Sequence, residues 1–160
     1  MVDSGDIRNV VLIGHGGSGK TSLTEAMLHK SGATNRLGSV DDKTSICDYY
    51  DEEKEHHHSI QSAAIYVNHA GKLINIIDTP GYPDFTGSAI KAIPAAETAI
   101  LVIGAAAGIE TNTRKMFQLA TEADIPRLIV INKMDAENVA FSELIKNIQP
   151  IDRKLCAVIL

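Results

Sequence analysis

The sequence has little with which to build a disulfide framework or a membrane span. It contains no tryptophan and two cysteines, Cys47 and Cys156, which lie far apart and have no CxxC partner. We expect both to be free thiols. The longest apolar runs, such as residues 99–103 and 128–131, are strand-length and far shorter than the roughly 20 residues that cross a bilayer. No membrane-spanning segment is therefore expected.

Positive charge is also scarce. The chain has 15 lysines and arginines against 20 aspartates and glutamates, a formal net charge of −5, and its basic residues are scattered. Proteins that grip nucleic acid through its phosphates need a basic surface, so we expect no strong direct nucleic-acid binding by this chain. The first ten residues, MVDSGDIRNV, carry acidic groups and no apolar core, unlike a secretory signal. A cytoplasmic protein is expected.

Short apolar runs alternate with helix-length amphipathic segments, which predicts an α/β fold with a mostly parallel sheet between two helix layers. With 160 residues, 44% of them hydrophobic, one domain over 1–160 is expected. The predicted strands are 9–13, 60–68, 72–78, 99–104, 127–132 and 155–160, and the predicted helices are 20–30, 84–97, 110–123 and 137–149.

Three local features refine this layout. Strands 60–68 and 72–78 are joined by three residues, which predicts one antiparallel hairpin. Pro94 has no backbone N–H, so it should kink the helix over 84–97 or end it early. Residues 33–59 are polar and lack periodicity, which predicts a mobile loop.

The strongest motif, GHGGSGKT, lies between the first predicted strand and the first predicted helix and fits G-x4-G-K-[ST]. In this pattern glycines let backbone N–H groups turn inward around phosphates, Lys20 reaches the outer phosphates, and the Thr21 hydroxyl can coordinate Mg²⁺. It predicts the three-layer fold of a P-loop NTPase. The expected phosphate-binding residues are Gly14, His15, Gly16, Gly17, Ser18, Gly19, Lys20, Thr21 and Ser22.

A second motif, Asp78-Thr79-Pro80-Gly81, follows the predicted strand 72–78. Open α/β sheets bind ligands at the carboxyl ends of their strands, so these four residues should contact the nucleotide. Asp78 should hold Mg²⁺ through water. An ordinary turn started by the aspartate is the alternative for this motif taken alone.

A third motif, Asn132-Lys133-Met134-Asp135, ends the strand 127–132. The Asp135 carboxylate can accept hydrogen bonds from both donors on the pyrimidine edge of guanine, whereas adenine presents no such pair. Asn132 and the Lys133 stem should shape and cover the base pocket. The three motifs in this order predict GTP and GDP as ligands, and they disfavour a small-molecule kinase that uses ATP.

With these motifs the sequence resembles the translational GTPases, and within them elongation factor G-like proteins, over essentially its whole length. The stretches GHGGSGKTSLTEAML, SIQSAA, INIIDTPGYPDF and PRLIVINKMD carry the resemblance. It implies Mg²⁺-dependent GTP hydrolysis in a protein that works on the ribosome, with Lys20 as a catalytic residue. It also implies a magnesium site made by Thr21, Ser59 and Asp78. The family pattern continues past 155–160 into further segments, so an incomplete, C-terminally truncated G domain is expected.

Three positions depart from the family pattern. Tyr82 stands where DTPGH places a histidine that orients the attacking water. Tyrosine can donate a hydrogen bond but does not become cationic near neutral pH, so Tyr82 is either a catalytic residue or only an aromatic cover. In the second case the chain would be a guanine-nucleotide switch with little catalysis. Gly17 replaces an aspartate that is thought to help bind a monovalent cation.

The third departure is the triplet His56-His57-His58, which replaces Arg-Gly-Ile before Ser59. Consecutive side chains on an extended segment point to opposite sides and rarely converge on one ion. We therefore expect a solvated loop here rather than a metal site.

Overall fold

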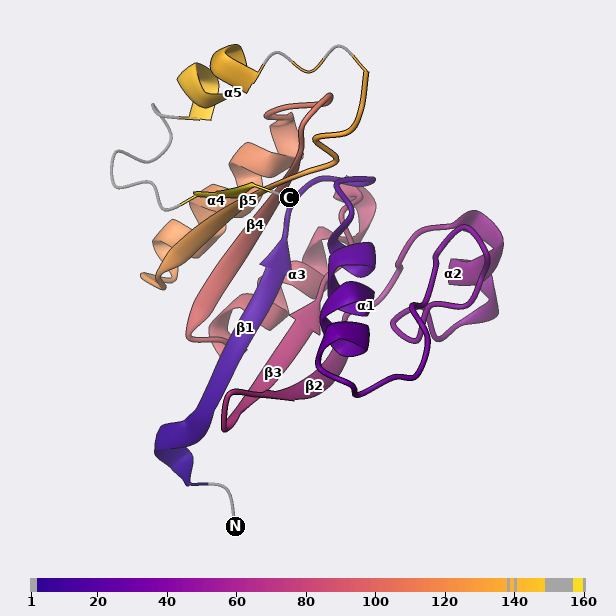
Figure 1. Ribbon diagram of the computed structural model, residues 1–160. Helices are drawn as coiled ribbons and strands as arrows, with labels where there is room; N and C mark the ends of the chain where they lie inside the picture. Colours follow the sequence, from indigo (N-terminus) through magenta and orange to yellow (C-terminus); the bar gives the residue numbers. More distant parts are fainter. Residues whose placement is uncertain (1–2, 138, 140, 149–156, 160) are drawn as a thin grey trace.

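The computed structural model describes residues 3–137, 139, 141–148 and 157–159. Within this part of the chain, six strands form one sheet in the order β2-β3-β1-β4-β5-β6 (Figure 1). Only β2 and β3 pair antiparallel; the other neighbours are parallel, which confirms the predicted sheet with one hairpin. The strands are β1 (Ile7–Ile13), β2 (Ala63–His69), β3 (Lys72–Asp78), β4 (Thr98–Gly104), β5 (Arg127–Asn132) and β6 (Ala157–Ile159).

Helices cover both faces of the sheet, and each face has its own apolar cluster. On one face, Leu28 of α1 packs with Leu12 and Val102. On the other face, Met116 of α4 and Leu144 of α5 pack in the cluster that contains β1, β4 and β5 side chains. The central strands are continuous apolar runs because both of their faces are buried. The helices are α1 (Lys20–Lys30), α2 (Asp51–His56), α3 (Thr86–Ala92), α4 (Thr111–Glu122) and α5 (Phe141–Ile148).

The structure corrects the prediction of a loop over residues 33–59. This segment contains the short helix α2, and the following strand begins at Ala63 rather than at residue 60. The prediction for Pro94 is confirmed, because α3 ends at Ala92 and a 3-10 turn, Ile93–Ala95, follows it. The last predicted helix and strand appear in part as α5 and β6. Residues 138, 140, 149, 155, 156 and 160 of those predictions lie outside the described residues.

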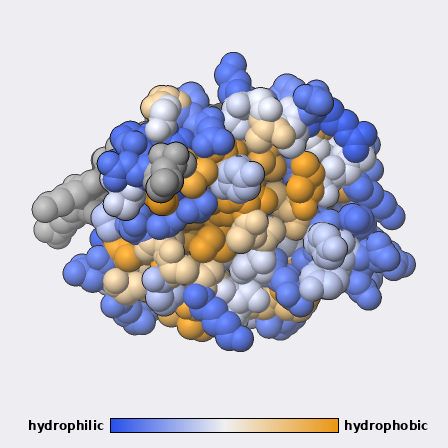
Figure 2. All heavy atoms as spheres, turned by 90° about the horizontal axis from the view of Figure 1, so that it is seen from below, coloured by the Kyte–Doolittle hydropathy of each residue, from blue (hydrophilic) through white to orange (hydrophobic). Residues whose placement is uncertain are grey.

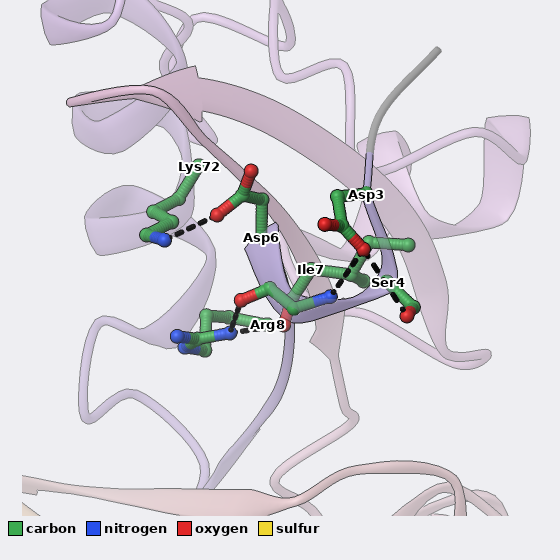
Figure 3. Close-up of polar contacts among 7 residues, drawn as sticks. Asp3, Ser4, Asp6, Ile7, Arg8 and Lys72 are labelled. Carbon is green, nitrogen blue, oxygen red and sulfur yellow. Dashed lines mark hydrogen bonds and ion pairs between the residues drawn. The ribbon is translucent and has the colours of Figure 1, made fainter.

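The first described residues are tied to the sheet by an ion pair (Figure 3). Asp6 ends a 3-10 turn, Ser4–Asp6, and its carboxylate contacts the Lys72 amine at the start of β3. The hydrogen bond and charge of Lys72 lower the pKa of Asp6. Arg8 also donates to the carbonyl oxygens of Gly5 and Ile7. These contacts hold the starts of β1 and β3 together.

Seen from below the view of Figure 1, the surface shows apolar side chains bordered by hydrophilic ones (Figure 2). No helix among the described residues is both long enough and apolar enough to cross a membrane.

Candidate functional site

A pocket of about 470 Å³ gathers most of the predicted site residues. It lies where β1 separates β3 from β4, a position at which the strand order changes direction and open α/β sheets bind ligands. The predicted residues that line it are Gly16, Gly17, Gly19, Lys20, Thr21, Ser22, Ser59, Thr79, Gly81, Tyr82 and Lys133. The segment before Ser59 forms another part of the wall through Leu37, Gly38, Ser39, Val40, Asp41, Asp48, His57 and His58.

The phosphate loop after β1 has the backbone that its glycines allow. Gly17 and Gly19 have φ angles of 74° and 91°, in the left-handed region. A Cβ at Gly14 would overlap the Val102 carbonyl oxygen, and one at Gly19 would overlap the Asn132 amide. The loop therefore packs against β4 and the third motif at two points that exclude any side chain.

Lys20 is buried at the start of α1. Its Nζ donates to the carbonyl oxygens of Gly14, at 3.3 Å, and His15, at 2.9 Å. Burial lowers the pKa of Lys20 to about 8, and the nearby charge of Asp78 opposes this shift. This buried amine is stabilised by two carbonyl oxygens and one nearby carboxylate, and an anion would stabilise its charge further.

Three predicted magnesium ligands meet although they come from three separate segments. The Thr21 hydroxyl donates to Asp78 Oδ2 over 2.7 Å, and it lies 3.2 Å from the Ser59 hydroxyl. Ser59 in turn donates to Asp48 Oδ1 over 2.8 Å. Sequence reasoning missed Asp48, because it lies in a polar segment without a motif. The arrangement forms a chain of oxygen atoms from Asp48 to Asp78.

The charges around these oxygen atoms fit a bound cation. Asp78 is fully buried, and the loss of hydration raises its pKa to about 6 despite the Thr21 bond and Lys20. Its Oδ1 is buried without a hydrogen-bond partner. Burial also raises the pKa of Asp48. Carboxylate and hydroxyl oxygens are the ligands that Mg²⁺ prefers, so Thr21, Ser59 and Asp78 fit that ion.

Among the described residues, no group of three or more His, Cys, Asp or Glu side chains could hold a metal ion. The remaining ligands of a cation at Asp78 would therefore be hydroxyls, water and the phosphates of a bound nucleotide, as is usual for Mg²⁺.

The start of α4 contacts two loops of the site, the phosphate loop after β1 and the second motif after β3. The buried His15 ring nitrogen Nδ1 lies 2.9 Å from the Thr113 hydroxyl. Burial is the main cause that lowers the pKa of His15. Asn112 donates from Nδ2 to the Gly81 carbonyl oxygen over 2.7 Å. Neither Asn112 nor Thr113 lies in a recognisable motif, and their role depends on a contact that only the fold reveals.

Two buried glutamates hold the segment over residues 33–59. Glu25 of α1 accepts from the Ser45 hydroxyl and from the backbone N–H groups of Ile46 and Cys47. Glu53 of α2 accepts from three backbone N–H groups, those of residues 50, 60 and 61. These carboxylates fix the stretches that carry Asp48 and Ser59.

The Tyr82 ring covers the phosphate loop. A Cβ placed on Gly16 would lie 3.1 Å from this ring, although the Tyr82 side chain is still 44% exposed. The His58 ring lies against it, with 4.7 Å between ring centroids. His56 and His57 are exposed, whereas His58 is half-buried. The triplet is not the predicted extended loop, because His56 is the last residue of α2 and His57 follows it with a φ of 54°.

The third motif is placed at the edge of the pocket. Asn132 donates to the Ser18 carbonyl oxygen over 3.1 Å, and Lys133, which has a φ of 60°, lines the pocket. Asp135 is exposed and is not among the lining residues, and neither are Gly14, His15, Ser18, Asp78, Pro80 and Asn132. Of these, Asp78 contacts the lining residue Thr21 and Asn132 contacts the phosphate loop at Ser18.

Comparison with known proteins gives the matching family and its named relatives. The family described as the elongation factor Tu GTP binding domain matches residues 5–156. The chain is 39% identical to the mitochondrial ribosome-releasing factor 2 of Lodderomyces elongisporus and 40% identical to that of Vanderwaltozyma polyspora. These matches cover 88% and 91% of the chain but only 17% and 18% of the two relatives. The chain thus spans less than a fifth of their length.

Solved structures of related proteins match this fold. A crystal structure of a protein from Thermus thermophilus matches with a TM-score of 0.86 and 35% identity, over 90% of this chain and 22% of that one. The bacterial selenocysteine-specific elongation factor EF-Sec matches with a TM-score of 0.74 and 26% identity, over 95% of this chain and 25% of that one. The motifs, the fold and these matches together show that the chain belongs to the translational GTPases, in the family of the elongation factor Tu GTP binding domain.

Proposed function

We propose that this chain binds GTP and hydrolyses it to GDP as the G domain of an elongation factor G-like translation factor. The observation that supports this most strongly is the meeting of Thr21, Ser59 and Asp78 close to the buried Lys20. A cation, hydroxyl oxygens and a carboxylate are what the outer phosphates and their magnesium ion need.

The binding residues divide into two groups. Backbone N–H groups of residues 14–22 would surround the phosphates, with residues 79–81 of the second motif at the outer end of the phosphate chain. Lys20 would exchange its two carbonyl partners for phosphate oxygens. Asn132, Lys133 and Asp135 would select guanine, because the Asp135 carboxylate can accept from two adjacent donors of that base.

The catalytic residues act on charge and on water. Bound Mg²⁺ would supply positive charge near the phosphates, with Thr21 and Ser59 as hydroxyl ligands and Asp78 holding it through water. Lys20 stabilises negative charge that develops during transfer of the γ-phosphoryl group to water. Tyr82 lies over the phosphate loop, where its hydroxyl can donate a hydrogen bond to the reacting groups.

The ribosome is the proposed partner. The relatives are named ribosome-releasing factor 2, and the resemblance to elongation factor G also supports the ribosome as partner. Those relatives are also named mitochondrial, so a cytoplasmic location stays a prediction for this chain. The absence of strong direct nucleic-acid binding stays a prediction as well.

Single-turnover GTP hydrolysis with and without ribosomes tests this function. We expect ribosomes to stimulate hydrolysis by the full-length protein, and Lys20→Ala to remove both the basal and the stimulated rate. An unstimulated wild-type protein would contradict the ribosomal role.

A nucleotide-binding switch with little catalysis is the second candidate. Tyr82 favours it, since this residue stands where the family pattern has the histidine that orients the attacking water. Tyr82→His separates the two functions. A wild-type protein that turns over as fast as this variant would exclude the second candidate.

A further inference from the structure

The three consecutive histidines at 56–58 have different surroundings. His58 is half-buried, and its ring contacts Tyr82, at 4.7 Å between centroids, His56, at 5.8 Å, and Phe85, at 6.1 Å. His58 also lines the nucleotide pocket, whereas His56 does not. One histidine of the triplet is therefore held by aromatic packing at the proposed reaction site.

One hydrogen bond sets where this ring carries its hydrogen. The His58 Nδ1 lies 2.9 Å from the backbone carbonyl oxygen of His56. A carbonyl oxygen can only accept, so Nδ1 is the donor in this contact. In the neutral ring, Nε2 then has the free lone pair and is the acceptor atom.

The position of the ring follows from its neighbours on two sides. Ser59 comes directly after His58, and its hydroxyl lies 3.2 Å from the Thr21 hydroxyl. On the other side, Tyr82 packs over Gly16 of the phosphate loop. His58 is thus linked both to the oxygen cluster that fits Mg²⁺ and to the ring that covers the phosphate loop.

Two carboxylate oxygens of this region already have partners, and the unpartnered Asp78 Oδ1 belongs to the buried oxygen cluster that fits Mg²⁺. Asp48 Oδ1 accepts from Ser59, and Asp78 Oδ2 accepts from Thr21. The neighbouring His57 is exposed, and its Nδ1 contacts the Val40 carbonyl oxygen at 3.2 Å. Of the two pocket-lining histidines, His58 is the one that packs on Tyr82.

We propose that His58 is the water-positioning residue of the reaction, an inference that rests on the proposed GTPase function. Its Nε2 accepts a hydrogen bond from the attacking water, and Tyr82 holds the ring in place. The water oxygen forms a bond to the γ-phosphorus while the bond from that phosphorus to the bridging oxygen breaks, and the electron pair leaves on GDP. The protons of the water pass to the product phosphate and to solvent, so His58 ends the reaction unchanged.

The test compares His58→Ala, His58→Gln and the control His69→Ala, an exposed histidine at the end of β2 outside the pocket lining, in single-turnover hydrolysis by the full-length protein with ribosomes. We expect His58→Ala to lower the rate constant of the hydrolysis step by about 100-fold, because the attacking water loses the acceptor that positions it. GDP affinity, measured by calorimetry, should stay the same. His58→Gln should keep part of the rate, since its amide oxygen can still accept, and His69→Ala should behave as wild type.

Two results would overturn the proposal while wild type remains an active GTPase. One is a His58→Ala rate equal to that of His69→Ala. The other is an equal loss of rate in both His58 variants together with weaker GDP binding, which would indicate a packing role. A wild-type protein that binds GDP but hydrolyses no GTP would instead contradict the proposed function itself, and this inference with it.

Discussion

The Thr21 hydroxyl donates a 2.7 Å hydrogen bond to Asp78 Oδ2 and so joins the first turn of α1 to the end of β3. The other carboxylate oxygen of Asp78 is buried and unpartnered, and the Ser59 hydroxyl lies 3.2 Å from that of Thr21. These side chains therefore form an oxygen cluster at the centre of the site. This cluster, and the segments that hold it, can be tested by substitution.

Thr21→Ala removes the hydroxyl at the centre of the cluster. We expect it to weaken GTP binding in the presence of Mg²⁺ by about tenfold, the usual effect of losing one hydrogen bond or ligand contact to a charged group. In EDTA the variant and wild type should bind alike. Calorimetry with both media measures this, and Thr121→Ala, on the exposed side of α4, is the control. Equal loss with and without Mg²⁺ would refute a metal-directed role for Thr21.

Lys20 should make nucleotide binding depend on pH, because burial lowers its pKa to about 8 in the free protein. Phosphates favour the ammonium form and raise this pKa in the complex. Well below pH 8 Lys20 is already protonated, so binding takes up no proton there. Above pH 8, binding should take up a proton, and GDP affinity should fall as pH rises.

Calorimetry in buffers of different ionisation enthalpy measures that uptake. Lys20→Arg is the control, because a guanidinium stays charged throughout this range. Identical heats in all buffers above pH 8 for the wild-type protein would contradict the assignment.

Glu53→Gln should loosen the segment that carries Ser59. Both Glu53 oxygens accept from backbone N–H groups, at 2.8 Å and 3.0 Å, so an amide NH₂ would face a donor at one of them. We expect the free energy of unfolding to fall by about 2 kcal/mol and the amides of residues 60 and 61 to exchange faster. Glu52→Gln, exposed on the same helix, should change neither. Equal behaviour of the two variants in hydrogen exchange would rule out this anchoring role.

Gly81→Ala and Gly87→Ala form a matched pair with opposite expected results. A Cβ at Gly81 would overlap the Lys20 amine and the His15 backbone, whereas a Cβ at Gly87 meets nothing within 4 Å. We expect Gly81→Ala to weaken GTP binding by about tenfold through overpacking. Gly87→Ala lies in α3 and should raise the free energy of unfolding by up to about 1 kcal/mol, because alanine favours helix. Nucleotide titration and thermal unfolding measure both, and unchanged GTP binding by Gly81→Ala would show that the loop has room to shift.

The sequence predicts the elements whose stability comes from burial. Local patterns are enough to predict the buried strands β1, β4 and β5 from their apolar runs. The spacing of the glycines at 14–19 likewise predicts the phosphate loop. The structure brings Thr21, Ser59 and Asp78 together, and their role as magnesium ligands stays a prediction.

The rest depends on contacts between distant residues. Helix α2 has the sequence DEEKEH, which shows no apolar periodicity, and its Glu53 bonds to residues 60 and 61. Asp48 and Asn112 act through partners 11 and 31 residues away, Ser59 and Gly81. His58 is half-buried whereas His56 and His57 are exposed, and this difference follows from packing against Tyr82 rather than from any local pattern.

The most direct test of guanine-nucleotide recognition is a calorimetric titration of the full-length protein with GDP and with ADP in millimolar magnesium. The phosphate loop and Asp135 together predict that GDP binds and ADP does not bind measurably. Equal binding of the two nucleotides, or no binding of GDP, would contradict the central claim that this site recognises a guanine nucleotide.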